Sequence, residues 1–493
     1  MSVDYKELKK DRATEWRQEL RNSLSAKERI KGIRVKMSEN DPEIRKTNFF
    51  EVNNGISAED ALTEAKRCLD CPTPTCISGC PVNINIPGFI KQIEKGDMKQ
   101  AAIVLKSTNA LPAICGRVCP QETQCEEQCM YNKLGLLPVA IGNLERFTAD
   151  TERLSGEMSM PEIAAPNHIK VAIVGSGPAG LTTAGELAKY GYDVTLFEAL
   201  HEFGGVLVYG IPEFRLPKEI MRVEIENLKK MGVKFVSNYI VGRTASFDDL
   251  KKDGFQAFFI GSGAGLPKFM NIPGENLINI FSSNEYLTRV NLMKAFRFPE
   301  YDTPIVRGKS VAVIGGGNTA MDSVRTAKRL GADRAMIIYR RSEAEMPARI
   351  EEIHHAKEEG VEFLNLNNPI EYIGDERGRV KQIRVQKMEL GEPDESGRRR
   401  PRPMEGSEYL IDVDVVVVGI GTAPNPLIQQ ALPELEMTAW GTVVVNDQMQ
   451  SVSRPDIFAG GDIVRGGATV ILAMGDGKVA AEAMHHYLQG KKD

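Results

Sequence analysis

Eight cysteines lie in two short groups in the first third of the 493-residue chain. The first group follows the pattern C-x2-C-x4-C-x3-C-P and comprises Cys68, Cys71, Cys76, Cys80 and Pro81. The second group follows C-x3-C-P-x5-C-x3-C and comprises Cys115, Cys119, Pro120, Cys125 and Cys129. Cysteines grouped in this way can form disulfides, bind zinc or bind iron–sulfur clusters.

The spacing favours iron–sulfur clusters. Zinc sites usually combine two C-x2-C pairs, and only Cys68 and Cys71 form such a pair. A C-x2-C run followed by C-x3-C-P is typical of cluster ligation, and the cysteine before the proline often serves a second cluster. Eight thiolates would suffice for two [4Fe-4S] clusters. Apolar residues recur at three and four positions in 57–68 and 88–106, which predicts helices around the cysteines.

Composition predicts the compartment and excludes some functions. Residues 1–21 are charged throughout and contain no signal-peptide core, so we expect a cytoplasmic protein with reduced cysteines. A net charge of −5 argues against nucleic-acid binding. No apolar run approaches membrane-spanning length, and the longest, 413–421, is interpreted as a buried strand.

A dinucleotide-binding fingerprint begins at residue 171. A β-branched strand leads into Gly175-x-Gly177-x-x-Gly180, and a helical segment then leads to a second strand that ends at Glu198. The glycines let the backbone approach a pyrophosphate at the helix N-terminus, and a strand-end carboxylate accepts hydrogen bonds from ribose hydroxyls. An acid at this position predicts FAD, although a solvated surface acid is the alternative.

A second dinucleotide-binding unit begins at residue 311. Its fingerprint is Gly315-x-Gly317-x-x-Ala320, and its second strand ends at Arg340 and Arg341 rather than at an acid. Arginines here favour a ribose 2′-phosphate and therefore NADPH, the alternative being an exposed basic pair. The residues predicted to bind NADPH are Gly315, Gly317, Asn318, Thr319, Ala320, Arg340 and Arg341.

The two copies are predicted to be nested. Segments 255–265 and 413–426 close the first and second units, and 456–484 supplies a strand, Gly461-Asp462 and a long helix without its own fingerprint. This tail is expected to complete the first unit, with Asp462 bonding the FAD ribityl chain. The residues predicted to bind FAD are Gly175, Gly177, Pro178, Ala179, Gly180, Glu198, Gly205, Arg215, Gly461, Asp462 and Thr469.

The predicted fold is therefore α/β, with a helical iron–sulfur domain followed by two nested Rossmann-like domains of the disulfide-reductase type. The expected boundaries are 1–160 for the cluster domain, 168–300 with 436–493 for FAD, and 301–435 for NADPH. Segment 378–403 is expected to form a hairpin with a polar, basic loop, and we assign no chemistry to it.

These motifs together resemble the small, β subunit family of bacterial NADPH-dependent glutamate synthases over nearly the whole chain. The same module resembles the N-terminal part of dihydropyrimidine dehydrogenase. The resemblance implies two [4Fe-4S] clusters, one held by Cys68, Cys71, Cys76 and Cys129. The other is implied to use Cys80, Cys119, Cys125 and Glu145, with Cys115 left over, which disagrees with a count of eight thiolate ligands.

The resemblance implies that NADPH reduces FAD and that electrons leave through the clusters to a large, α subunit in a hetero-oligomer. That partner would make glutamate from glutamine and 2-oxoglutarate. Two alternatives remain open: a ferredoxin-type or bifurcating NAD(P)H:acceptor oxidoreductase subunit, and a non-catalytic flavoprotein that only supports a partner. A disulfide reductase is excluded, because no cysteine lies beside either nucleotide fold.

Overall fold

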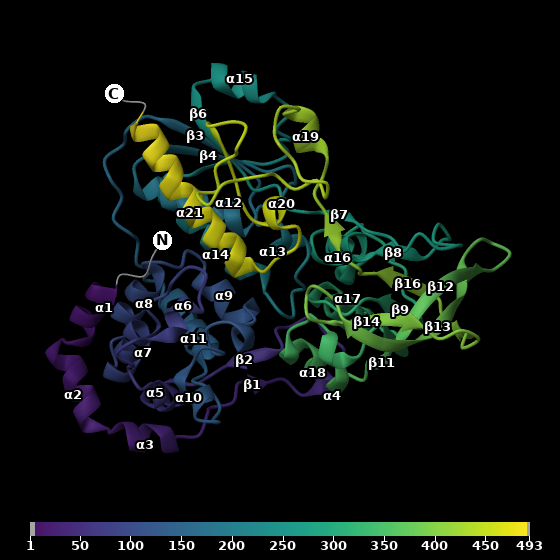
Figure 1. Ribbon diagram of the computed structural model, residues 1–493, viewed down its shortest axis with the longest axis horizontal. Coiled ribbons are helices and arrows are strands. Elements are labelled where there is room, and N and C mark those ends of the chain that lie inside the picture. Colours follow the sequence, from purple (N-terminus) through teal and green to yellow (C-terminus); the bar gives the residue numbers. More distant parts are fainter. Residues whose placement is uncertain (1–4, 491–493) are drawn as a thin grey trace.

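The computed structural model describes residues 5–490 and has three parts (Figure 1). The first part, at the lower left of Figure 1, is helical, while the other two contain one parallel sheet each. The main helices of the first part are α5 (Ala58–Arg67), α7 (Ile86–Lys95), α8 (Met98–Lys106), α9 (Pro112–Val118) and α11 (Ile141–Ser155). Around its outside run α1 (Tyr5–Arg12), α2 (Glu15–Ser23) and α3 (Ala26–Lys31).

Local capping explains where the helices predicted around the cysteines begin and end. The Ser57 side chain accepts a hydrogen bond from Asp60 N at the start of α5. Asn85 caps α7 in the same way through Gly88 N, and Gly96 ends α7 in the left-handed conformation. Helices α5, α7 and α8 therefore confirm the prediction and carry the first cysteine group between them.

The second part contains a five-stranded parallel sheet in the order β18-β6-β3-β4-β5. Its strands are β3 (Lys170–Val174), β4 (Asp193–Phe197), β5 (Lys234–Val236), β6 (Phe255–Ile260) and β18 (Ile457–Ala459). Helices α12 (Pro178–Lys189), α14 (Lys218–Lys230) and α21 (Val470–Gln489) belong to this part. The C-terminal strand β18 pairs with β6, so the sheet joins segments almost 200 residues apart.

The third part contains a second parallel sheet in the order β11-β10-β9-β16-β8. Its strands are β8 (Ile280–Ser282), β9 (Ser310–Ile314), β10 (Arg334–Tyr339), β11 (Glu362–Asn365) and β16 (Val415–Val418). It also contains helices α16 (Ser283–Asn291), α17 (Asn318–Arg329) and α18 (Ile350–Glu358). The apolar run 413–421 contains β16, which lies next to the central strand β9. All four residues of β16 are buried, as predicted.

An antiparallel sheet extends the third part. Strands β12 (Asn367–Gly374), β13 (Val380–Pro393), β14 (Arg399–Pro403) and β15 (Tyr409–Asp412) form it, with β13 paired to the other three. The β13–β14 pair confirms the predicted hairpin. Where the chain passes between the two nucleotide folds, β7 (Leu266–Pro267) pairs with β17 (Thr422–Ala423), so the two crossings lie side by side.

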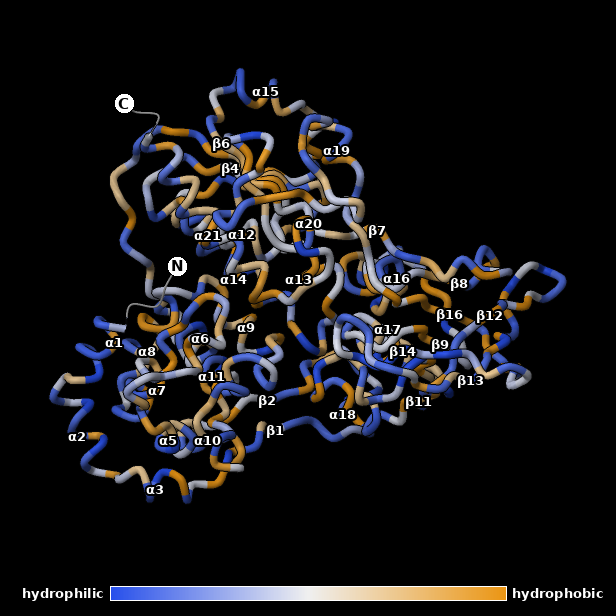
Figure 2. The backbone as a smooth tube through the Cα atoms, in the orientation of Figure 1, coloured by the Kyte–Doolittle hydropathy of each residue, from blue (hydrophilic) through white to orange (hydrophobic). Residues whose placement is uncertain are grey.

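Apolar segments concentrate in the interior of each part, and the two sheets have separate cores (Figure 2). The α/β fold with a helical domain and two nested parallel-sheet units confirms the predicted fold class.

The domain boundaries remain a prediction. Strand β8 precedes residue 301 yet joins the second sheet, which favours an earlier start for that unit. Within residues 5–490 no helix has the length and apolarity needed to cross a membrane.

Candidate cofactor sites

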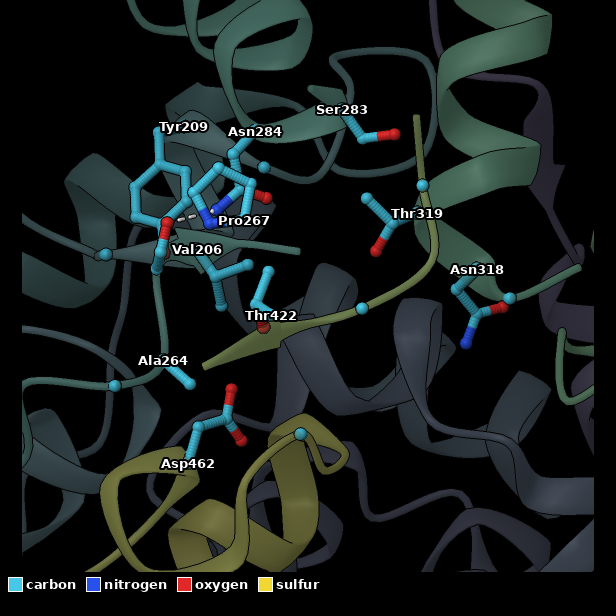
Figure 3. A pocket seen from close by; sticks show the side chains of 18 of the residues that line it. Val206, Tyr209, Ala264, Pro267, Ser283, Asn284, Asn318, Thr319, Thr422 and Asp462 are labelled. Carbon is cyan, nitrogen blue, oxygen red and sulfur yellow. Dashed lines mark hydrogen bonds between the residues drawn. The ribbon is translucent and has the colours of Figure 1, made fainter. Parts of the chain in front are cut away.

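A cavity of about 1420 Å³ lies between the two nucleotide folds. Figure 3 shows Asp462 from the second part facing the same space as Asn318 and Thr319 from the third. Most residues predicted to bind FAD or NADPH line this cavity, and the exceptions are Gly180 and Ala320. The structure therefore brings the two fingerprints to one shared space.

The two fingerprints are built alike. A Cβ on Gly175 would lie 2.5 Å from Gly261 O, and one on Gly315 would lie 2.2 Å from Gly419 O. Both glycines have positive φ, so each turn packs against the strand that closes its unit. Gly180 serves helix packing rather than the cavity, because its Cβ would lie 2.0 Å from Gly175 O. These close approaches give a backbone cradle that fits a pyrophosphate.

Glu198 follows directly after β4 and its carboxylate is fixed by three donors. Oε2 accepts hydrogen bonds from Ser176 N (3.0 Å) and Ser176 Oγ (2.5 Å), and Oε1 accepts one from Leu200 N (2.9 Å). The residue is buried and lines the cavity. This position fits a ribose hydroxyl of an adenosine bound at the first fingerprint.

Asp462 lies at the start of the C-terminal helices. Its Oδ1 accepts a hydrogen bond from Ala468 N (3.0 Å), and burial raises the pKa of Asp462 to about 6 against that hydrogen bond. Thr469 caps α21 by accepting a hydrogen bond from Leu472 N, and both residues line the cavity. The long helix α21 thus points its positive end into the space where we expect the flavin.

The two arginines after β10 differ in their surroundings. Arg340 is exposed, lines the cavity and takes part in no hydrogen bond or ion pair within residues 5–490. Arg341 is buried, and its guanidinium donates to Arg399 O (2.8 Å) and pairs with Asp394 Oδ2 (2.7 Å). From the sequence both arginines are predicted to bind NADPH, whereas in the described part of the chain only Arg340 of the two lacks a partner.

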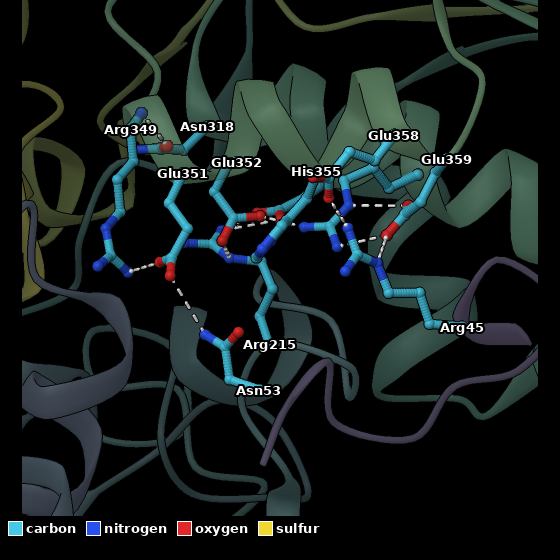
Figure 4. A network of polar contacts seen from close by, with 12 residues as sticks. Arg45, Asn53, Arg215, Asn318, Arg349, Glu351, Glu352, His355, Glu358 and Glu359 are labelled. Carbon is cyan, nitrogen blue, oxygen red and sulfur yellow. Dashed lines mark hydrogen bonds and ion pairs between the residues drawn. The ribbon is translucent and has the colours of Figure 1, made fainter. Parts of the chain in front are cut away.

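Arg215, predicted to bind FAD, lines the cavity but also joins the two nucleotide folds. Its guanidinium pairs with Asp322 Oδ1 at 2.8 Å and with Glu352 Oε1 at 2.9 Å, both in the third part. Burial raises the pKa of Asp322 to about 6 against the opposing effect of Arg215. The first part joins the same charge network through Arg45, whose Nε lies 3.1 Å from Glu359 Oε1 (Figure 4).

The cysteines separate into two pockets. The outer pocket contains Cys68, Cys71, Cys76 and Cys129. All eight cysteines are free thiols, so no disulfide competes with a cluster. Burial raises the pKa of Cys71 to about 11, which disfavours a thiolate here without a bound cation. Four thiols around one small space form a donor set that fits a [4Fe-4S] cluster.

Arginines of the N-terminal helices hold the loop of the outer pocket. Asp70 lies between Cys68 and Cys71 and is fully buried. Its carboxylate pairs with Arg17 and with Arg21 (2.5 Å) of α2. Sequence reasoning did not identify Asp70, because its partners lie about 50 residues away and no local pattern links them.

The inner pocket contains Cys80, Cys115, Cys119, Cys125 and Glu145. Glu145 accepts a hydrogen bond from Asn109 Nδ2 (2.6 Å) and forms no ion pair within the described residues. Burial raises the pKa of Glu145 to about 8 against that hydrogen bond. A buried acid without a cationic partner, surrounded by thiols, fits a ligand of a metal cluster.

Cys115 lies in the same pocket, where its thiol shares a hydrogen bond with Cys119. Its Sγ lies 3.7 Å from Asn109 Oδ1 and 3.5 Å from the sulfur of Met474 in α21. Asn109 therefore contacts both Glu145 and Cys115, the two candidates for the fourth ligand. Sequence reasoning missed Asn109, since a single asparagine carries no ligand motif.

The inner pocket adjoins the nucleotide cavity. Val118 and Pro120, on either side of Cys119, line the cavity. Ile471 in the first turn of α21 lines the inner pocket, while its neighbour Val470 lines the cavity. Neighbouring residues around Cys119 and in the first turn of α21 therefore line the two spaces.

Comparisons with known proteins agree with this geometry. The profile for dihydropyrimidine dehydrogenase domain II, 4Fe-4S cluster, matches residues 45–157, and that for pyridine nucleotide-disulphide oxidoreductase matches 169–477. The chain is 37% identical over 453 residues to the glutamate synthase [NADPH] small chain of Azospirillum brasilense, covering 91% of this chain and 93% of that one.

Two further proteins resemble this chain, one in sequence and one in structure. The β subunit of NADP(+)-dependent formate dehydrogenase from Moorella thermoacetica is 38% identical over 440 residues, covering 85% of this chain and 60% of that one. The solved structure of Mycobacterium tuberculosis FprA in complex with NADPH has a TM-score of 0.56 at 20% identity. It covers 66% of this chain and 86% of that chain, and it supports the fold.

The fold, the two fingerprints and the cysteine pockets define an NADPH-dependent oxidoreductase that contains FAD and iron–sulfur clusters. Within that class, the chain belongs to the family of NADPH-dependent glutamate synthase small chains. The individual ligands of each cofactor, and the number of clusters, remain predictions.

Proposed function

We propose that this chain is the electron-input subunit of a glutamate synthase, which supplies electrons from NADPH to a large partner subunit. The observation that carries the proposal is the order of the sites. The nucleotide cavity adjoins the inner pocket, and the outer pocket has three partly exposed cysteines, Cys71, Cys76 and Cys129. This order provides an entry for electrons, a buried intermediate site and an exit toward the surface.

The chain's own residues bind and orient the cofactors. FAD, when bound, supplies the conversion of two-electron hydride transfer into single-electron transfer to iron–sulfur clusters. The cradle formed by Gly175 and Gly177 would hold its pyrophosphate and Glu198 its ribose. Gly315, Gly317 and Arg340, which line the same cavity from the third part, would hold NADPH.

The inner pocket would hold a cluster through Cys80, Cys119, Cys125 and Glu145. The outer pocket would hold another through Cys68, Cys71, Cys76 and Cys129. The short separation at Val470 and Ile471 would limit the distance between the cavity and the inner pocket. We expect the large subunit to cover the outer pocket, since electrons must leave the chain there. A cytoplasmic location is part of the same proposal.

The function is tested with the purified, cluster-loaded chain and the matching large subunit. We expect the chain alone to oxidise NADPH with ferricyanide or a tetrazolium dye. Glutamate should form from glutamine and 2-oxoglutarate only after the large subunit is added.

The outcomes separate the alternatives. Glutamate formation by the chain alone would contradict the proposed division of labour. Rapid dye reduction without glutamate in the presence of the large subunit would favour an NAD(P)H:acceptor reductase. Absence of dye reduction by chain loaded with both FAD and clusters would favour a non-catalytic supporting role.

A further inference from the structure

The turn of the β13–β14 hairpin brings an additional arginine to the nucleotide cavity. Arg398 lines the cavity together with Arg340 and Arg341. The neighbouring Arg399 and Arg400 of the same hairpin are exposed and do not line it. The hairpin is the segment to which the sequence assigned no chemistry.

Asp394 holds both this turn and Arg341. One carboxylate oxygen, Oδ1, accepts hydrogen bonds from Ser396 N (2.9 Å) and Arg398 N (3.3 Å). The other, Oδ2, pairs with Arg341 Nη2 at 2.7 Å. Asp394 N also donates to Arg398 O at 2.8 Å, and Gly397 supplies the positive φ that the turn requires. Arg398 is thereby fixed beside Arg341.

The guanidinium groups differ in what they can still bind. Arg341 has its charge balanced by Asp394, and its Nε is occupied by Arg399 O. Arg398 uses only Nε, which donates to Ser396 Oγ at 3.0 Å, and its two terminal nitrogens have no partner in residues 5–490. The Arg340 guanidinium likewise has no hydrogen-bond or ion-pair partner among the described residues. The cavity wall therefore presents two guanidinium groups, one from the end of β10 and one from the hairpin, that remain available for an anion.

We propose that Arg398 and Arg340 together bind the 2′-phosphate of NADPH, while Arg341 is a positioning residue that fixes the hairpin turn through Asp394. This inference rests on the proposed use of NADPH. A dianionic phosphate suits two planar guanidinium groups, each of which can donate two parallel hydrogen bonds. NADH has no 2′-phosphate, so Arg398 would add to the selectivity between the two nucleotides.

Steady-state kinetics of the cofactor-loaded chain tests the proposal. We expect Arg398→Ala to lower kcat/KM for NADPH by about tenfold or more through KM, with little change for NADH. Arg398→Lys should recover part of the loss. Arg400→Ala is the matched control, because it removes an arginine from the same hairpin outside the cavity, and it should leave both nucleotides unaffected. Asp394→Asn should weaken NADPH use less than Arg398→Ala, because the phosphate contact itself remains.

Binding of adenosine 2′,5′-bisphosphate and adenosine 5′-monophosphate, measured by calorimetry, gives a readout independent of turnover. If the unmodified chain prefers the bisphosphate and Arg398→Ala removes much of that preference, the inference holds. If Arg340→Ala removes the preference while Arg398→Ala keeps it in full, the inference is wrong and the NADPH proposal stands. If the unmodified chain shows no preference and uses NADH as well as NADPH, the proposed NADPH use itself is wrong.

Discussion

The outer and inner pockets hold similar sets of cysteines in different settings. Three of the four outer cysteines are partly exposed, and arginines of α2 fix their loop through Asp70. All four inner cysteines are buried, and their acid, Glu145, has no cationic partner within the described residues. The inner pocket also adjoins α21 and the nucleotide cavity. The difference supports the proposal that the inner pocket receives electrons from the flavin and the outer pocket delivers them to a partner.

Removing one cysteine from either pocket should have the largest effect, because it should remove a whole cluster. The intact chain, purified anaerobically, should contain about eight iron atoms if both pockets hold [4Fe-4S] clusters. Cys68→Ser and Cys80→Ser should each lose about four, from the outer and inner pocket respectively, because a cluster rarely persists without one of its thiolates. Assays of iron and acid-labile sulfide measure the cluster content of each variant. Stoichiometric zinc without sulfide would contradict both sites.

Asp70→Asn should destabilise the outer pocket selectively. The change leaves buried Arg17 and partly buried Arg21 without their shared carboxylate, which costs about 3 kcal/mol in comparable buried pairs. We expect faster hydrogen exchange in α2 and a lower iron content.

Asp11→Asn is the matched control for that change. Asp11 also pairs with Arg17, at 2.6 Å, but its side chain is 36% exposed. A cost below about 1 kcal/mol is expected for such a pair. Equal effects of the two substitutions would show that burial of Asp70 does not matter.

Gly475→Val should disturb the junction between α21 and the inner pocket. A Cβ at Gly475 would lie 3.0 Å from the carbonyl oxygen of Pro81, directly after Cys80. A branched side chain must push the helix or the turn away, at about 1–3 kcal/mol. Thermal unfolding measures the cost. Gly490→Ala, at the open end of the same helix, should cost little, because its Cβ would meet nothing closer than 3.7 Å.

Replacing the proposed fourth ligand of the inner pocket should have the smallest effect on the chain. Glu145→Ala should alter the EPR signal of one cluster, since loss of a ligand changes its environment. Cys115→Ala should leave both signals nearly intact, because Cys80, Cys119, Cys125 and Glu145 would already supply four ligands without Cys115. The opposite pattern would return Cys115 to the ligand set.

The sequence predicted features whose determinants are local. Each fingerprint is a strand, turn and helix within about 30 residues, so Gly175, Gly315 and the acid or arginine at the following strand end could be placed from spacing alone. The cysteine spacing likewise indicated two clusters.

Contacts between distant segments could not be predicted in this way. Asp394 lies 53 residues from Arg341, and nothing in either local sequence links them. The pairing of Asp70 with α2 and the approach of Gly475 to Pro81 depend equally on the tertiary fold. These contacts decide which arginine remains available and how α21 packs against the inner pocket.

The order of the two pockets is tested most directly by rapid anaerobic mixing with NADPH, followed by freezing and EPR. In Cys68→Ser, NADPH should reduce the flavin and then the inner cluster. In Cys80→Ser, the flavin should be reduced at the normal rate, while reduction of the outer cluster should become much slower than in the unmodified chain. Reduction of the outer cluster at an unchanged rate in Cys80→Ser would contradict a path through the inner pocket.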